Sequence, residues 1–378
     1  MKKLSFIFAM MFAASMAMAQ NTSLLVQKGS TNDALVKQIG IGNNDKVHQY
    51  GNNDDATVKQ IGSYNIAVAD QLLGDRNTAT VLQDNNSNQA YLVQGMNTGY
   101  FSADGVTTLD IAAYDNIGSI TQGSGVRNYS ELHQMGNNNN GSVVTSGNDN
   151  FAYIYQGWAG SWWGEPSILG NNNTASIKQT WNNNWGGIWQ DGNNNGANLL
   201  QDGTSNMGRI SQGYNYTGIT GVAYTPYVQY NQANVTQIGI GNYLRLFQLG
   251  DANLFKLKQS GDYNTVGGRT TIGDYRKNFF QQYGNSNKFT GVYRSGNDLW
   301  FDINADAEQS NGATLSETSY QKGDLNRIGL VQGQGDVALI QQDGYNNEAV
   351  LWQHGGGQNA EIMQTGSTNT ANVLQQNQ

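Results

Sequence analysis

A short alternating pattern of small, aliphatic and glutamine residues recurs along the chain. Ala56, Val58 and Gln60 form one example, separated by the variable residues Thr57 and Lys59. The same triplet recurs at Ala79, Val81 and Gln83, at Ala197, Leu199 and Gln201, at Ala360, Ile362 and Gln364, and at Ala371, Val373 and Gln375. A period of two is typical of a β-strand with one buried face. The pattern therefore predicts short strands that bury the triplet and expose the residues between.

The glutamines that end these strands are spaced by eleven residues over most of the chain. Abundant Gly, Asn and Gln with only 13% charged residues is compatible with disorder or with a β-aggregating segment. A strict register favours an ordered repeat over disorder. We interpret these glutamines as a stacking core that includes Gln38, Gln49, Gln60, Gln71, Gln190, Gln201, Gln237, Gln248, Gln342, Gln353, Gln364 and Gln375.

A glycine follows many of these glutamines after one residue, and an asparagine follows three residues later. These pairs are Gly40 and Asn43, Gly62 and Asn65, Gly192 and Asn195, Gly239 and Asn242, Gly344 and Asn347, and Gly366 and Asn369. Gly and Asn are the residues that best tolerate positive φ, so each pair predicts a tight turn.

Each eleven-residue unit is therefore predicted to be one strand and one turn. If the chain reverses at every turn, two units make one rung of a β-solenoid, and rungs stack about 4.8 Å apart. Glutamines then lie above one another, and side-chain amides can form a ladder along the stack. The predicted fold is all-β, a solenoid that stacks in cross-β fashion into amyloid-type fibres.

The first residues predict export. Lys2 and Lys3 precede an apolar run, and Ala17-Met18-Ala19 matches a small-x-small cleavage site. This is typical of a signal peptide over 1–19, with Gln20 as the first mature residue, and the apolar run is too short for a stable membrane span. No later segment is apolar enough to span a membrane.

The mature chain has 18 Lys and Arg against 28 Asp and Glu, because two of the 20 basic residues lie in 1–19. That balance argues against nucleic-acid binding, and the lack of cysteine excludes disulfides.

The repeat Gln-x-Gly-x-x-Asn-x-Ala-x-x-x-Gln resembles the curlin repeat of bacterial curli fibres. Residues 190–201, 342–353 and 364–375 fit it at every fixed position. The resemblance extends over most of the mature chain, 20–378. It implies secretion through an outer-membrane channel to the cell surface, and self-assembly with copies of itself and other curlin-type subunits into extracellular amyloid. Such fibres serve adhesion and the biofilm matrix.

The repeat register breaks in five places, and some turn residues are replaced. Irregular insertions are predicted near 95–118, 157–168, 213–228, 270–280 and 294–318. Trp181 stands at a glycine position, and Asp54 and Gln358 stand at asparagine positions. The chain is also longer than the few-repeat subunits typical of the family, and a Gly-rich secretion segment is absent after Gln20.

No constellation of residues predicts catalysis, a metal site or a cofactor. His48 and His133 are expected on outward faces, and His354 in a turn, with no metal-ligand spacing. Nothing supplies a nucleophile or a tuned acid–base pair, so an enzyme is not expected. Tryptophans form the candidate surface-binding set, since exposed indoles can stack on sugars or partner proteins: Trp162, Trp163, Trp181, Trp185 and Trp189. The alternative interpretation is that these side chains pack over the flank of the solenoid or pair between fibrils.

Three functions are compatible with these features: a major fibre subunit, a minor subunit that nucleates or anchors the fibre, and a monomeric adhesin that binds glycans through its Trp-rich segment. Only Gln376, Asn377 and Gln378 follow the last repeat, and so short a tail leaves no room for a terminal cap. An uncapped strand edge templates the addition of another chain. We therefore expect a fibre subunit.

Overall fold

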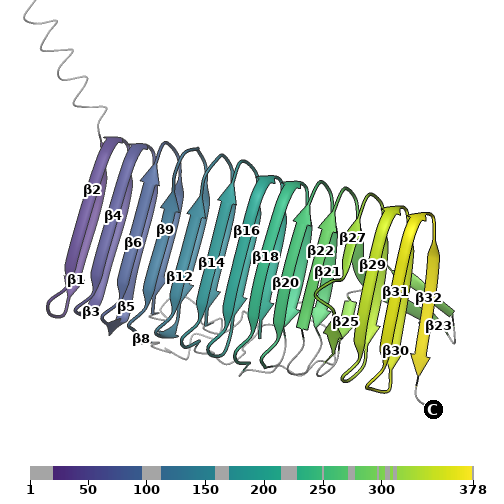
Figure 1. Cartoon of the computed structure of the whole chain (residues 1–378). Coiled ribbons are helices and arrows are strands. Elements are labelled where there is room, and N and C mark those ends of the chain that lie inside the picture. Colours follow the sequence, from purple (N-terminus) through teal and green to yellow (C-terminus); the bar gives the residue numbers. More distant parts are fainter. Residues whose placement is uncertain are drawn as a thin grey trace, which may run out of the picture.

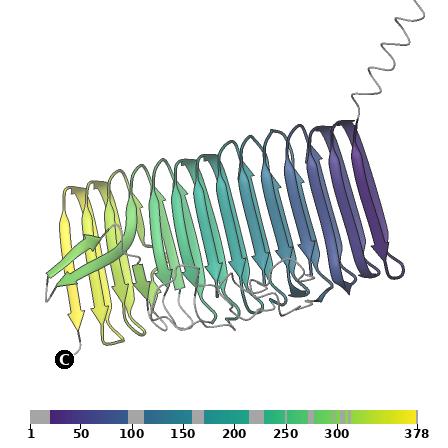
Figure 2. The same cartoon turned by 180° about the vertical axis from the view of Figure 1, so that it is seen from behind.

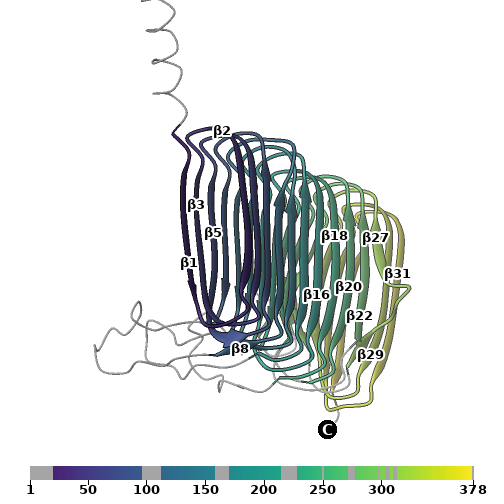
Figure 3. The same ribbon diagram turned by 90° about the vertical axis from the view of Figure 1, so that its left-hand side faces the viewer.

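Two parallel β-sheets face each other along the length of the molecule (Figure 1). The computed structural model describes residues 20–95, 112–157, 170–213, 228–248, 251–270, 277–295, 298–302, 307–309 and 313–376. Viewed along the stack, the chain passes from one sheet to the other at every turn, and the strands form two layers (Figure 3). The predicted β-solenoid is thereby confirmed, and the described ranges contain strands and turns but no helix.

We call the two layers sheet 1 and sheet 2. Sheet 1 contains β1 (Thr22–Lys28), β3 (Asn44–Asn52), β5 (Ile66–Asp75), β7 (Gln89–Gln94), β10 (Tyr129–Gln134), β13 (Phe151–Gln156), β15 (Trp185–Gln190), β17 (Met207–Gln212), β19 (Tyr243–Gln248), β21 (Thr265–Thr270), β23 (Lys288–Ser295), β28 (Arg327–Gln332), β30 (Glu348–His354) and β32 (Thr370–Gln376), joined by β24 (Asp298–Asp302) and β25 (Ala307–Gln309). Sheet 2 contains β2 (Asp33–Ile41), β4 (Asp55–Ser63), β6 (Thr78–Asp84), β9 (Ile117–Gln122), β12 (Asn140–Thr145), β14 (Thr174–Thr180), β16 (Gly196–Thr204), β18 (Gln232–Ile240), β20 (Leu254–Ser260), β22 (Lys277–Tyr283), β26 (Thr314–Leu315), β27 (Tyr320–Lys322), β29 (Val337–Tyr345) and β31 (Asn359–Ser367). A short pair, β8 (Ala113–Tyr114) and β11 (Gly136–Asn137), lies in the turns.

Apart from β24, the strands of the two sheets pair in parallel with the strand one rung away, so like residues stack on like. In β2 and β4, Ala34 pairs with Ala56 and Gln38 pairs with Gln60. Ala56, Val58 and Gln60 are fully buried, whereas the residues between them are partly exposed. One continuous apolar core therefore runs between the sheets, and each buried Val or Ile stabilises it by about 1.5–3 kcal/mol.

The two long edges of the solenoid differ. Turns that follow sheet 2 strands form the upper edge in Figure 1, and turns that follow sheet 1 strands form the lower edge. The ranges 96–111, 158–169 and 214–227, which lie outside the described residues, begin after β7, β13 and β17, all strands of sheet 1. Gly95, Gly157 and Gly213 precede them, each with positive φ.

Strand pairing resumes inside some of the predicted insertions. Within 95–118, Ala113 already pairs with Gly136. Within 270–280, Lys277 pairs with Leu254 of the solenoid. Within 294–318, the short strands β25 and β26 continue the two sheets. The described residues that interrupt the solenoid are therefore fewer than the sequence pattern indicates, because a strand can keep its backbone pairing after it has lost the repeat residues.

An antiparallel hairpin departs from the solenoid near its C-terminal end. Strand β24 pairs with the end of β23 and crosses the outer surface of β28 and β30, visible in green over the last strands in Figure 2. Val350 faces outward from β30 yet is fully buried, in contact with Val331, Trp352 and Leu374. This end of sheet 1 is therefore covered on its outer face.

Candidate functional site: amide ladders and open edges

Inward-facing glutamines form hydrogen-bonded ladders along the solenoid axis. In sheet 2, Gln38 Nε2 donates to Gln60 Oε1 (2.9 Å), and Gln60 Nε2 donates to Gln83 Oε1 (2.9 Å). Gln60 Nε2 also donates across the core to the Asn44 carbonyl (3.0 Å). The buried amides are thus satisfied on several sides, and each would otherwise cost about 1–3 kcal/mol.

The structure distributes the sequence-predicted glutamines between two such ladders. Sheet 1 carries Gln49, Gln71, Gln190, Gln248, Gln353 and Gln375, and sheet 2 carries Gln38, Gln60, Gln201, Gln237, Gln342 and Gln364. All of them face the interior, and those away from the two ends are fully buried. The strand ends therefore contribute polar side chains to the core without leaving them unpaired.

The sheet 2 ladder has one internal break, at Thr145 of β12. Thr145 occupies the register position between Gln122 and Gln179. Its Oγ1 atom and Gln179 Oε1 are buried and lack hydrogen-bond partners. Gln122 Nε2 turns instead to Ser130 Oγ (3.1 Å). Threonine is too short to bridge the two amides, so the break leaves a local defect in the core.

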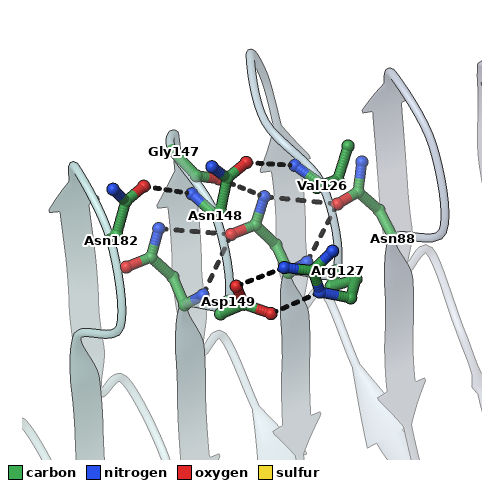
Figure 4. Close-up of polar contacts among 9 residues, drawn as sticks. Asn88, Val126, Arg127, Gly147, Asn148, Asp149 and Asn182 are labelled. Atoms are coloured by element: carbon green, nitrogen blue, oxygen red, sulfur yellow. Dashed lines mark hydrogen bonds and ion pairs between the residues drawn. The ribbon is translucent and has the colours of Figure 1, made fainter.

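Buried asparagines form further ladders inside the turns. Asn65 donates from its backbone N and from Nδ2 to Asn43 Oδ1 (3.1 and 3.0 Å), and its Nδ2 also donates to the Asn85 carbonyl (2.7 Å). Figure 4 shows the same pattern at Asn88, together with the neighbouring Asn148 and Asn182. Beside this ladder the exposed side chains of Arg127 and Asp149 form an ion pair, and Arg127 Nε donates to Asp149 Oδ1 (2.6 Å).

The predicted turn residues divide into two roles. The glycines have positive φ, from 92° at Gly192 to 131° at Gly344, and all except Gly366 lie against the backbone of the next turn along the stack. The ladder asparagines do not have positive φ; the residue before each of them does, as at Tyr64 and Asn194. The asparagines therefore mark the turns, but they do not occupy the positive-φ positions; their side-chain amides form the ladder instead. The predicted turn residues Gly40, Asn43, Gly62, Asn65, Gly192, Asn195, Gly239, Asn242, Gly344, Asn347, Gly366 and Asn369 all lie in or beside these turns.

Two substituted turn positions have physical consequences. Asp54 stands in an asparagine ladder, where Asn77 donates to its Oδ1 from the backbone N (3.0 Å) and Nδ2 (3.2 Å), yet burial raises the pKa of Asp54. Trp181 adopts φ of 69° at a glycine position, and its side chain is 65% exposed. Asp191, in the turn after β15, is also buried, and burial raises its pKa to about 7.

The predicted tryptophan set does not form one surface. Trp162 and Trp163 lie outside the described residues, and Trp181 lies on the upper edge. Trp185 and Trp189 instead lie on the outer surface of β15, beside aromatic side chains of β13. We define the aromatic face by the outward residues Tyr91, Tyr129, Phe151, Tyr153, Tyr155, Trp185 and Trp189.

Rings of the aromatic face stack between neighbouring strands. The centroids of Tyr129 and Phe151 are 4.6 Å apart, and those of Tyr155 and Trp189 are 6.0 Å apart. Sequence reasoning missed this cluster because it compared inward positions. An alignment of outward positions would have found it, since Tyr129, Phe151 and Trp185 share one register position.

The outermost strands are open. Strands β1 and β2 begin the two sheets, and β31 and β32 each pair with one strand. Leu24 and Leu25 of β1 are 50% and 44% exposed, and the inward residues Ala360 and Val373 are only partly buried. The apolar core is therefore exposed at both ends of the described solenoid.

Two segments match a protein-family model, the curlin associated repeat, at residues 51–84 and 170–203. The chain carries curlin repeats. Comparison with curated proteins found no match. The curlin repeat belongs to structural amyloid subunits and not to an enzyme family, so it implies a structural role, self-assembly and an extracellular location. In the described ranges, no group of three or more His, Asp or Glu residues is arranged to hold a metal ion, and no helix is long and apolar enough to cross a membrane.

Proposed function

We propose that this protein is a secreted structural subunit that assembles end to end into extracellular, curli-like amyloid fibres for adhesion and biofilm matrix. Its partners are copies of itself, other curlin-type subunits and an outer-membrane secretion channel, and residues 1–19 direct export. The observation that carries this proposal is the match between the two open ends.

The last strands of one copy fit the first strands of the next in the register used throughout the solenoid. Continuing that register places Gln375 over Gln27 in sheet 1, and Ile362 over Val36 and Gln364 over Gln38 in sheet 2. These three inward residues therefore meet residues of the same type across the junction. Open strand edges with exposed apolar residues favour such addition.

The amide ladders have a direction, and only head-to-tail addition preserves it. Where one glutamine bonds to the next, it donates toward the C-terminal end, as Gln353 Nε2 does to Gln375 Oε1 (2.8 Å). The asparagines donate in the opposite sense, as Asn369 Nδ2 does to Asn347 Oδ1 (2.9 Å). At a head-to-tail junction Gln375 faces the acceptor Gln27 Oε1, and Asn369 Oδ1 faces a donor. Two like ends would place donor against donor in one kind of ladder and acceptor against acceptor in the other.

Charge favours the same arrangement. Over residues 20–43 the chain has two lysines and one aspartate, a formal charge of +1, whereas residues 355–376 have one glutamate, a charge of −1. Unlike ends therefore attract weakly and like ends repel, which contributes more to orientation than to affinity.

The test is to block one end. In Val373→Lys, a charge lies on the inward face of β32, where an unpaired buried ammonium is strongly unfavourable. Added in small amounts to the wild-type protein, this variant should join fibres through its N-terminal edge and then stop their growth, which shortens them in electron micrographs. The matched control is Asn372→Lys, whose side chain faces outward on the same strand. Equal fibre lengths with the two variants would refute end-to-end growth.

A further inference from the structure

One column of side chains on the outer surface of sheet 1 combines aromatic rings with opposite charges. It runs through six successive strands from β7 to β19 and consists of Tyr91, Glu131, Tyr153, Gly187, Arg209 and Arg245. The remaining rings of the aromatic face flank it. The column is thus acidic near one end and basic near the other.

The charged groups of the column lie among aromatic rings. Glu131 accepts hydrogen bonds from Tyr129 and from Tyr155 Oη (2.5 Å to Oε2), and its one ion-pair contact within the described residues is His133, 3.8 Å away. Arg209 lies 4.7 Å from the centre of the Trp189 ring, and Arg245 lies 4.9 Å from that of Phe247. The Glu131 side chain remains 19% exposed.

Gly187 shapes the middle of the face. An added methyl group there would collide with the rings of Trp185 and Trp189, which lie over the glycine backbone. The two indoles therefore lie close to the backbone of the sheet, and Tyr153 lies beside them on the preceding strand.

We propose that this face pairs with the same face of a second copy, with the two solenoid axes antiparallel. A two-fold axis along the strand direction, between β13 and β15, reverses the order of the column in the partner. Glu131 then faces Arg209 of the second copy, and Tyr153 faces the low indoles around Gly187. Tyr91 meets Arg245, a cation–π pair.

Charge decides between the two ways of placing the faces together. Parallel axes would set Glu131 against Glu131 and arginine against arginine, and like charges across an interface are costly. The antiparallel pair is isologous and makes each ionic contact twice, as expected for a two-fold interface. The pairing is lateral, so it does not depend on end-to-end growth.

The test uses single cysteines in the full chain, which has none of its own. Packed sheets lie about 10 Å apart, and Glu131 and Arg209 are three strand steps, about 14 Å, apart along one chain. In the antiparallel pair, Glu131→Cys of one copy therefore lies about 10 Å from Arg209→Cys of the other, whereas two copies of one variant hold their thiols about 17 Å apart. A bis-maleimide that spans only the shorter distance should cross-link the mixture and neither variant alone.

Two kinds of control accompany the cross-linking experiment. Ser176→Cys on the outer surface of sheet 2 should not cross-link to either variant. In sedimentation, Glu131→Arg and Arg209→Glu should each weaken pairing, and the double variant should restore it, provided that circular dichroism shows folded chains. Absence of the mixed cross-link, or filaments of single width that still grow, would overturn lateral pairing and leave end-to-end growth intact. Retention on an immobilised β-glucan that requires Trp185 and Trp189, without cross-linking, would overturn it in favour of a carbohydrate surface.

Discussion

Replacing Gln201 by Met tests whether the glutamine ladders stabilise the solenoid. Met is unbranched and of similar length, so it fills the same space without the amide. Gln201 accepts from Gln179 Nε2 (2.8 Å) and donates to Gln237 Oε1 (2.8 Å). The substitution therefore leaves one buried donor and one buried acceptor without their ladder partner.

Each orphaned group costs about 1–3 kcal/mol, so Gln201→Met should destabilise the chain by about 2–6 kcal/mol. The larger apolar side chain offsets only a small part of this loss. Urea unfolding of the soluble chain, followed by circular dichroism, measures the difference. The matched control places the same residue on the outer surface of the same strand, as Asn198→Met, where water replaces the lost hydrogen bonds.

The control should change stability by no more than about 0.5 kcal/mol. If Gln201→Met and Asn198→Met are equally stable, the ladder amides do not contribute to stability, and burial of the apolar triplets alone accounts for the fold. A large loss in the control instead would mean that the two faces of β16 are assigned wrongly.

Three further changes test other features. Thr145→Gln fills the break in the sheet 2 ladder and gives Gln179 Oε1 a donor, so urea unfolding should show a gain of about 1 kcal/mol; a loss would mean that the site is too tightly packed for glutamine. Because burial raises the pKa of Asp191 from 3.8 to about 7, the folded state binds a proton that the unfolded state has released, and stability should fall as the pH rises from about 4 through about 7. Asp191→Asn should flatten that part of the profile; an unchanged profile would contradict the assignment. Deleting 158–167 should leave fibre formation intact, since loop length has little effect on closure entropy, and loss of fibres from the secreted protein would place this segment in the stacked core.

The strand register could be predicted from the sequence because it depends on contacts that repeat. Each triplet such as Ala56, Val58 and Gln60 meets the same triplet 22 or 23 residues away. Local alternation defines which face is buried, and identical neighbours make one register better than any other. The two-layer solenoid and its inward Ala, aliphatic and Gln positions follow from that.

The tertiary structure decided what the repeat does not encode. The asparagine ladders were hidden because a turn preference and a buried side-chain amide favour the same residue. The sequence did not reveal that one face gathers Tyr91, Glu131, Tyr153 and Arg209, because segments of unequal length separate their strands. The ladder glutamines of β7 and β10 are 40 residues apart, and those of β13 and β15 are 34 residues apart. A fixed period cannot align such positions. Only the folded chain, in which the strands on either side of these segments pair with one another, brings the outward side chains together.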